Sequence, residues 1–231
     1  MRTPTIKSQK FFSDEIREQT LDLGEIEKFY MARGGWRDDE KSYHKFIFRI
    51  EKLIRSSYEY KKYMKFLKDE IDMNQCAFFS GVSRDNARIE IHHAPLTLFD
   101  ITSIVLNEMS SFDVNVTAFE VAERVMKEHF SGNIGLIPVS KTIHDLIHCG
   151  EIFVPVQNVF GNVKEFYFKY ERYFTDEQRD LLRAIIERSR RIDIDNYKPE
   201  VLEKTYTYIK VDGYTFPQYI ESPLIEEKKN A

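Results

Sequence analysis

The histidines are the residues of this chain whose type and spacing could do chemistry. Four of the six lie in two short segments of the sequence. In the later segment Ser140 is a good helix N-cap and Gly150 a good residue just past a helix end, so a short helix is predicted between them. His144 and His148 are four residues apart, which places both imidazoles on one face of that helix, within reach of one cation.

The earlier segment contains the adjacent pair His92 and His93. Residues 88–92 alternate polar and apolar side chains like a half-buried strand, and Pro95 predicts that the strand ends near His93. Imidazoles are typical ligands of zinc, nickel, iron and copper, and three protein ligands with an open position are typical of catalytic sites. A fourth histidine beside three ligands is suited to general-base catalysis, because imidazole titrates near neutral pH.

The two remaining histidines carry no such pattern. His44 and His129 each stand alone on a predicted helix, and we interpret them as ordinary core or surface residues.

The overall composition indicates a folded protein of 231 residues with 42% hydrophobic residues. Because the formal net charge is -4, binding to a nucleic acid would have to come from a local basic patch. Cys76 and Cys149 form neither a CxxC pair nor a disulfide framework, as expected in a reducing compartment. With no apolar run of membrane-spanning length, we expect a cytoplasmic protein with no membrane partner, in the host cytoplasm if it is phage-encoded.

Hydrophobic periodicity predicts a mostly helical chain with a few short strands. The predicted helices cover residues 13–23, 39–72 (one helix or two, with Ser56-Ser57 as the weak point), 98–109, 117–130 and 175–190. The predicted strands are 76–79, paired with 88–92 in a hairpin, then 152–154, 165–168, and 206–211 with 214–216 around Asp212-Gly213. The 39–72 segment holds the most basic tract, which we interpret as solvated surface in preference to a phosphate site. Its cations are Lys52, Arg55, Lys61, Lys62, Lys65 and Lys68.

The histidine segments resemble the two ends of a known nuclease motif. The sequence Glu90-Ile91-His92-His93 with Pro95, followed by residues 141–148 and Gly150, resembles the HNH, or ββα-metal, endonuclease family. The match is closest to the HH…H…H form found in colicin nucleases and phage-encoded endonucleases. Residues 136–139 resemble the short hydrophobic run that precedes the metal helix in that family. The resemblance covers about a quarter of the chain.

The resemblance implies roles for individual residues. His92, His144 and His148 would bind a divalent metal ion, with Zn, Mg, Mn and Ni all candidates, and His93 would be the general base that activates water. The ion would stabilise charge on the phosphoryl oxygens and the leaving group. Outside the histidines, Lys141 and Arg88 are the candidates for contact with a nucleic-acid phosphate.

The chain departs from the family pattern at two places. The family usually has an asparagine nine positions before the first helix histidine, and Gly135 occupies that position here; Asn133 is the candidate substitute for orienting the base. The second departure is the insertion 94–134, which carries two predicted helices where the family has a short loop. Such an insertion costs little entropy once its ends are held together.

The sequence therefore predicts an α+β fold, mostly helical, with an embedded ββα-metal unit and an accessory C-terminal β-hairpin. The expected parts are an N-terminal helical region (1–72), the HNH-like domain (73–170) and a C-terminal helix and hairpin (171–231). We expect a metal-dependent endonuclease or nickase that acts on DNA, with RNA as the second candidate substrate. The alternative is a catalytically degenerate HNH-fold protein that binds a nucleic acid or a protein as a regulator. A third reading is a metal that only staples the fold.

Overall fold

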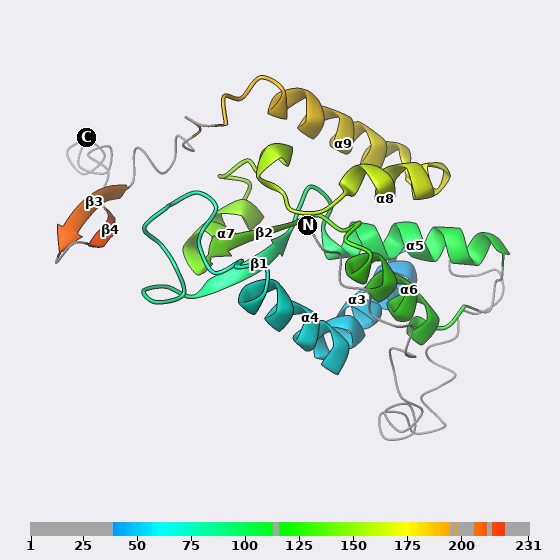
Figure 1. Cartoon of the computed structure of the whole chain (residues 1–231). Helices are drawn as coiled ribbons and strands as arrows, with labels where there is room; N and C mark the ends of the chain where they lie inside the picture. The colour runs from blue at the N-terminus through cyan, green and yellow to red at the C-terminus, as the bar shows by residue number, and fades with distance from the viewer. Residues whose placement is uncertain (1–38, 113–115, 195–196, 198–205, 212–213, 220–231) are drawn as a thin grey trace, which may run out of the picture.

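The computed structural model describes residues 39–112, 116–194, 197, 206–211 and 214–219. The helix predicted at 13–23 lies outside these residues. The described helices are α3 (Glu40–Ser56), α4 (Tyr58–Asp69), α5 (Leu98–Phe112), α6 (Ala118–Phe130), α7 (Lys141–His148), α8 (Val163–Tyr170) and α9 (Asp176–Ser189), with short 3-10 turns η1 (Val156–Asn158) and η2 (Glu171–Tyr173). The strands are β1 (Ile89–His93), β2 (Leu136–Ser140), β3 (Tyr206–Val211) and β4 (Tyr214–Tyr219). The arrangement, shown in Figure 1, confirms a mostly helical α+β fold.

The long basic segment forms two helices, and the break falls at the predicted serines. Ser57 has an extended backbone, its N–H still bonds to carbonyls at the end of α3, and its side chain accepts a hydrogen bond from the backbone N–H of Tyr60. One residue therefore ends α3 and caps α4. The buried face of α3, centred on Ile47 and Ile50, packs against α5 and α6.

The central sheet has two strands, and they come from either side of the insertion. Strand β1 pairs antiparallel with β2, with His92 opposite Ile137 and His93 opposite Leu136. The predicted hairpin of 76–79 with 88–92 is therefore wrong. Residues 76–79 form turns, because Phe79 N–H bonds back to Cys76 O at 3.2 Å.

Two further strand predictions differ from the structure. Residues 165–168 belong to helix α8, which begins at the N-cap Asn162 and buries Phe166 and Tyr170, four residues apart, in the core. Helical spacing of two aromatic side chains outweighed the β propensity of the segment. Residues 152–154 have no strand pairing. The hairpin of β3 and β4 is present as predicted, with Val211 opposite Tyr214.

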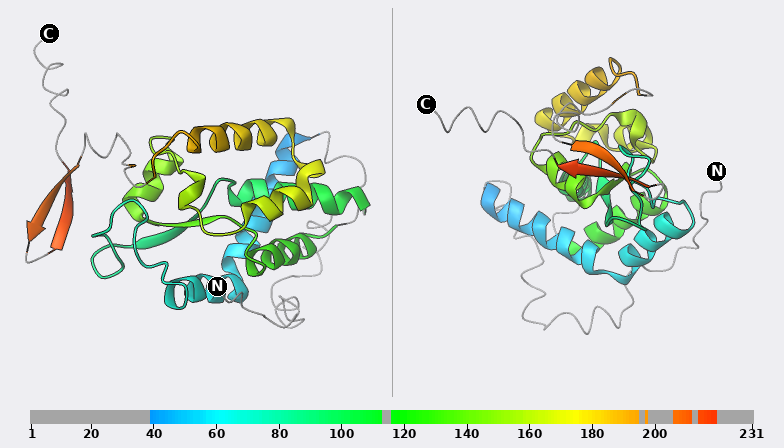
Figure 2. Two further views of the ribbon diagram at one scale, coloured as in Figure 1. Left: turned by 45° about the horizontal axis from the view of Figure 1, so that its top comes forward. Right: turned by 90° about the vertical axis from the view of Figure 1, so that its left-hand side faces the viewer.

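The insertion 94–134 folds back on itself as the helix pair α5 and α6, which supplies much of the main core. Thr117 and Glu120 form a capping box at the start of α6, where the sequence predicted a helix to begin. The sheet lies between two hydrophobic clusters: the larger contains α3 to α6, and the smaller contains Ile137, Val139 and Ile143 beneath α7. Figures 1 and 2 show α4 and α7 on opposite sides of the sheet. None of the helices in the described ranges is long and apolar enough to cross a bilayer.

The two ends of the insertion meet at Gly135. Ala94 N–H bonds to Gly135 O at 3.1 Å, so the backbone of β1 is joined to the residue before β2. A Cβ atom on Gly135 would lie 2.0 Å from Ala94 O and 2.7 Å from a methyl of Val163. The backbone approach thus requires glycine at the position where the nuclease family has asparagine.

Gly135→Asn is expected to lower the free energy of unfolding by roughly 3 kcal/mol or more, because backbone must move to admit the side chain. Gly150→Ala is the matched control: a Cβ there meets nothing within 4 Å, and only its φ of +76° is unfavourable. We expect that control to lose about 1 kcal/mol. Urea unfolding followed by circular dichroism measures both, and equal losses would contradict the close approach.

Candidate metal centre

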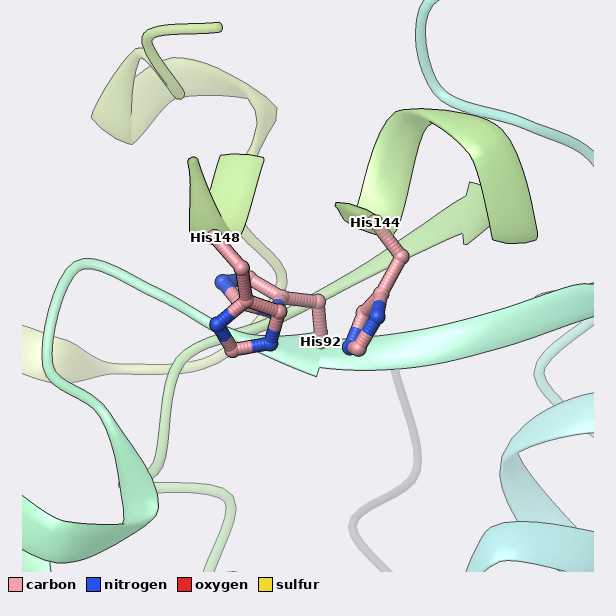
Figure 3. Close-up of side chains that lie close together, drawn as sticks. All are labelled: His92, His144 and His148. Carbon is pink, nitrogen blue, oxygen red and sulfur yellow. The ribbon is translucent and has the colours of Figure 1, made fainter. Parts of the chain in front are cut away.

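Three of the four clustered histidines face one another in the space between strand β1 and helix α7. His92 comes from β1, and His144 and His148 come from α7, as Figure 3 shows. One ligand atom from each lies within 4.8 Å of the others. The ring centroids are 5.0 Å apart from His92 to each of the other two, and 4.5 Å apart between His144 and His148. This separation makes the three histidines a candidate site for an ion such as zinc, which binds imidazole nitrogen at ~2.1 Å.

Local sequence fixes α7 in the position that this cluster requires. The Ser140 side chain accepts a hydrogen bond from Ile143 N–H at the start of the helix, as predicted. Ile143 is 1% exposed and anchors the helix in the smaller hydrophobic cluster. Gly150 ends the helix with a positive φ of 76°. The helix therefore lies across the sheet with its histidine face toward β1.

A carboxylate holds one of the three imidazoles. Glu90 lies two residues before His92, on the same face of β1, and its Oε2 is 3.2 Å from His144 Nδ1. The other carboxylate oxygen of Glu90 pairs with Arg88 Nε at 2.9 Å. With Nδ1 turned to Glu90, the Nε2 atom of His144 is left to bind a cation, which is the usual outer-sphere arrangement of metal-binding histidines.

Burial keeps the imidazoles in the form that binds metal. Desolvation, reinforced by the nearby His144 and His148, lowers the pKa of His92 to about 4. Burial likewise lowers the pKa of His144. Both rings are thus neutral at pH 7, with a lone pair available for a metal ion.

The fourth histidine points the other way. Adjacent side chains of a strand lie on opposite faces, and His93 is buried at 5% exposure on the face opposite to His92. Its Nε2 lies 3.0 Å from the Nε2 of His129 in α6, whose ring packs edge-on against Tyr60 and Tyr63. The structure therefore does not bring His93 to the other three histidines.

His129 is a core histidine, in line with its interpretation from the sequence, but its partner His93 was not predicted. It is 0% exposed, and its Nδ1 lies 2.8 Å from the carbonyl of Val125. A bond from Nδ1–H to that carbonyl leaves His129 Nε2 as an acceptor for His93 Nε2–H. Its 36-residue separation from His93 gave no signal in the sequence.

The asparagine proposed to orient a base is likewise engaged in the core. Asn133 Nδ2 donates to Glu128 Oε2 at 2.8 Å, and the hydroxyl of Tyr170 donates to Glu128 Oε1 at 2.8 Å. Lys169 forms an ion pair with the same carboxylate, which is almost wholly buried. Asn133 therefore helps to satisfy a buried charge, and the structure shows no contact between it and the three histidines.

The two candidate phosphate contacts lie on exposed parts of the same unit. Lys141, in the first turn of α7, forms an ion pair with Asp145, and Arg88 pairs with Glu90. Lys141 Nζ and Arg88 are both solvent-accessible, with side-chain exposures of 49% and 77%.

The comparisons place this chain among phage proteins. A family model described as "Bacteriophage G278-like virion protein" matches residues 6–214. The chain belongs to this family. The phage origin that the sequence analysis considered is therefore supported by the family. No curated protein and no solved structure matches the chain.

His144→Ala should weaken metal binding roughly a hundredfold or more, because one of three ligands is removed. His44→Ala is the matched control, since His44 lies on α3 and is half-exposed. Titration with Co²⁺, followed by its visible absorption, measures both affinities. Equal affinities for the wild type and His144→Ala would show that the three histidines do not hold the ion.

Glu90→Gln should reduce metal affinity about 10- to 100-fold, because the charged acceptor that orients His144 is lost. Asp145→Asn is the control: this exposed carboxylate lies 3.9 Å from His144 Nδ1 and is already paired with Lys141. The same titration compares them, and a larger effect for Asp145→Asn would refute the role given to Glu90.

The unfolding free energy should fall as pH drops from 6.5 toward 4. Burial lowers the pKa of His129 from 6.5 to about 4. Between these pH values, His129 is therefore protonated in the unfolded chain but neutral in the folded chain. The loss from this residue approaches roughly 3 kcal/mol at the acid end, and none is expected above pH 6.5. Urea midpoints across this range test it. His129→Gln, which cannot be protonated, should flatten the slope, and an unchanged slope would refute the assignment.

Proposed function

We propose that this phage protein is a metal-dependent nuclease that hydrolyses phosphodiester bonds of DNA. The observation that carries the proposal is the convergence of His92, His144 and His148 on one point of a strand–strand–helix unit. Three imidazole ligands form a site of the catalytic type, with positions left for water and substrate. The family description names a virion protein and states no activity, so the proposal rests on the histidine cluster.

The roles of the residues follow from their positions. A divalent ion would supply Lewis-acid stabilisation of charge on the phosphoryl oxygens. His92, His144 and His148 would hold the ion, and Glu90 would fix the tautomer of His144. His93 is not assigned the base, since its ring bonds to His129 on the other face of the sheet.

A second candidate is a metal-containing binding protein without catalysis. The features that favour it are the burial of His93 and the close approach at Gly135, which leaves no space for the asparagine of the nuclease family. In that case the ion would staple α7 to β1, and a nucleic acid or a protein would be bound elsewhere on the surface.

Incubation with supercoiled plasmid and a divalent ion distinguishes the two functions. The nuclease proposal predicts nicking by the wild type and by His44→Ala, and its loss with His144→Ala or with a chelator. Bound metal without nicking would favour the binding protein.

His93→Gln provides a separate test of the base. Loss of a general base lowers a rate by ~10²–10⁴-fold. The core position of His93 predicts instead that nicking per folded molecule stays within a few-fold of the wild type while the urea midpoint falls. A loss of ~10²–10⁴-fold in the nicking rate with no change in the urea midpoint would show that His93 is the general base after all.

A further inference from the structure

A basic cleft lies between helix α4 and the segment that leads into β1. Its volume is about 600 Å³. We call it the basic cleft, and its cationic lining consists of Arg55, Lys61, Lys65, Lys68, Arg84 and Arg88. Asp69 is the only acidic residue that lines it within the described part of the chain.

The cations of α4 share one face of the helix because of their spacing. Lys61, Lys65 and Lys68 follow one another at steps of four and three residues, so they form one stripe. Lys62, one position along, is also exposed but does not line the cleft. These three lysines therefore form a row of positive charge along the face of α4 that lines the cleft.

The charges within the cleft are only partly neutralised. Asp69 lies 4.0 Å from Lys65 and 3.5 Å from Arg84, so one carboxylate is shared by two cations. Lys68 Nζ donates to the carbonyl of Ile89 at 2.9 Å and keeps its charge. Lys61 has no ion pair with any residue that the structure describes. A net positive groove remains on a chain whose total charge is -4, so the positive field is local.

The cleft is joined to the histidine cluster through side chains. Arg88 lines the cleft and pairs with Glu90, and Glu90 in turn holds His144. His92 is three residues beyond Ile89 on β1, a distance of roughly 10 Å along a strand. A polyanion bound in the cleft would have to pass around the edge of β1 to reach the metal centre, because α4 and α7 lie on opposite sides of the sheet.

From this geometry we infer that the basic cleft binds the phosphate backbone of a nucleic acid and directs it toward the three histidines. The row of lysines on α4 contacts phosphates without reading bases, so binding should be independent of sequence and weakened by salt. The last part of the inference, delivery to the histidines, rests on the proposed nuclease function; binding in the cleft does not.

The test is fluorescence anisotropy of a labelled DNA duplex of mixed sequence, in chelator, with the full chain. The cleft variant is Lys61→Gln with Lys65→Gln, and the matched control is Lys52→Gln with Lys62→Gln, which removes the same charge from exposed positions outside the cleft. Each phosphate contact contributes about 0.9 to the slope of log K against log salt. We expect the cleft variant to bind about tenfold or more weakly, with a slope reduced by one to two units, and the control to stay within about threefold of the wild type.

Equal weakening in both variants would overturn the inference, because the effect would then belong to total charge. Unchanged binding in the cleft variant, or no binding by the wild type, would overturn it as well. Plasmid nicking separates this outcome from that of the proposed function. Cleft-dependent binding with no nicking by any protein would retain the cleft and reject the nuclease. Nicking that persists at the wild-type rate in the cleft variant, with unchanged binding, would retain the nuclease and reject the cleft.

Discussion

The two-residue period of strand β1 is the constraint on which this structure depends. Because neighbouring side chains must face opposite sides, Glu90 and His92 turn toward α7 while Ile91 and His93 turn toward the main core. A strand covered on both faces cannot shift by one residue without exchanging the two sets. The same register that brings His92 to the helix histidines therefore buries His93.

Two polar networks are buried on the face of β1 that packs against the main core. His93 and His129 satisfy each other, and Glu128, the neighbour of His129 in the sequence, is satisfied by Asn133, Tyr170 and Lys169. A buried carboxylate or imidazole without such partners would cost several kcal/mol. These contacts join α6 and α8 to the sheet, so the insertion 94–134 serves as part of the scaffold for the histidine cluster.

Local signals in the sequence predicted much of this architecture. Ser140 and Gly150 bounded α7, Thr117 and Thr175 began their helices, and Ser57 marked the break between α3 and α4. Each of these is a short-range effect of backbone hydrogen bonding. The convergence of His92, His144 and His148 also agrees with helical and strand spacing.

The failures at the strand pairing of β1 and at His93 share a different physical origin, since both involve partners distant in the sequence. The strand partner of β1 lies beyond a folded insertion, and only the close approach of Gly135 to Ala94 shows how the ends are joined. Whether His93 lies beside the metal centre or in the core depends on which face of the sheet α7 covers. Its partner His129 lies on another helix, α6. Strand pairing, and the side of the sheet on which each side chain is buried, depend on tertiary contacts, so residue spacing within one segment could not predict them.

The most direct test of the account is X-ray absorption at the edge of a bound zinc or cobalt ion, with one equivalent of metal added to the full chain. The account predicts imidazole nitrogens in the coordination sphere at about 2.0–2.1 Å, with that imidazole signal reduced by His144→Ala and unchanged by His44→Ala. An ion ligated by water and carboxylate oxygens alone, or an imidazole signal that survives His144→Ala intact, would contradict a metal centre at the three histidines.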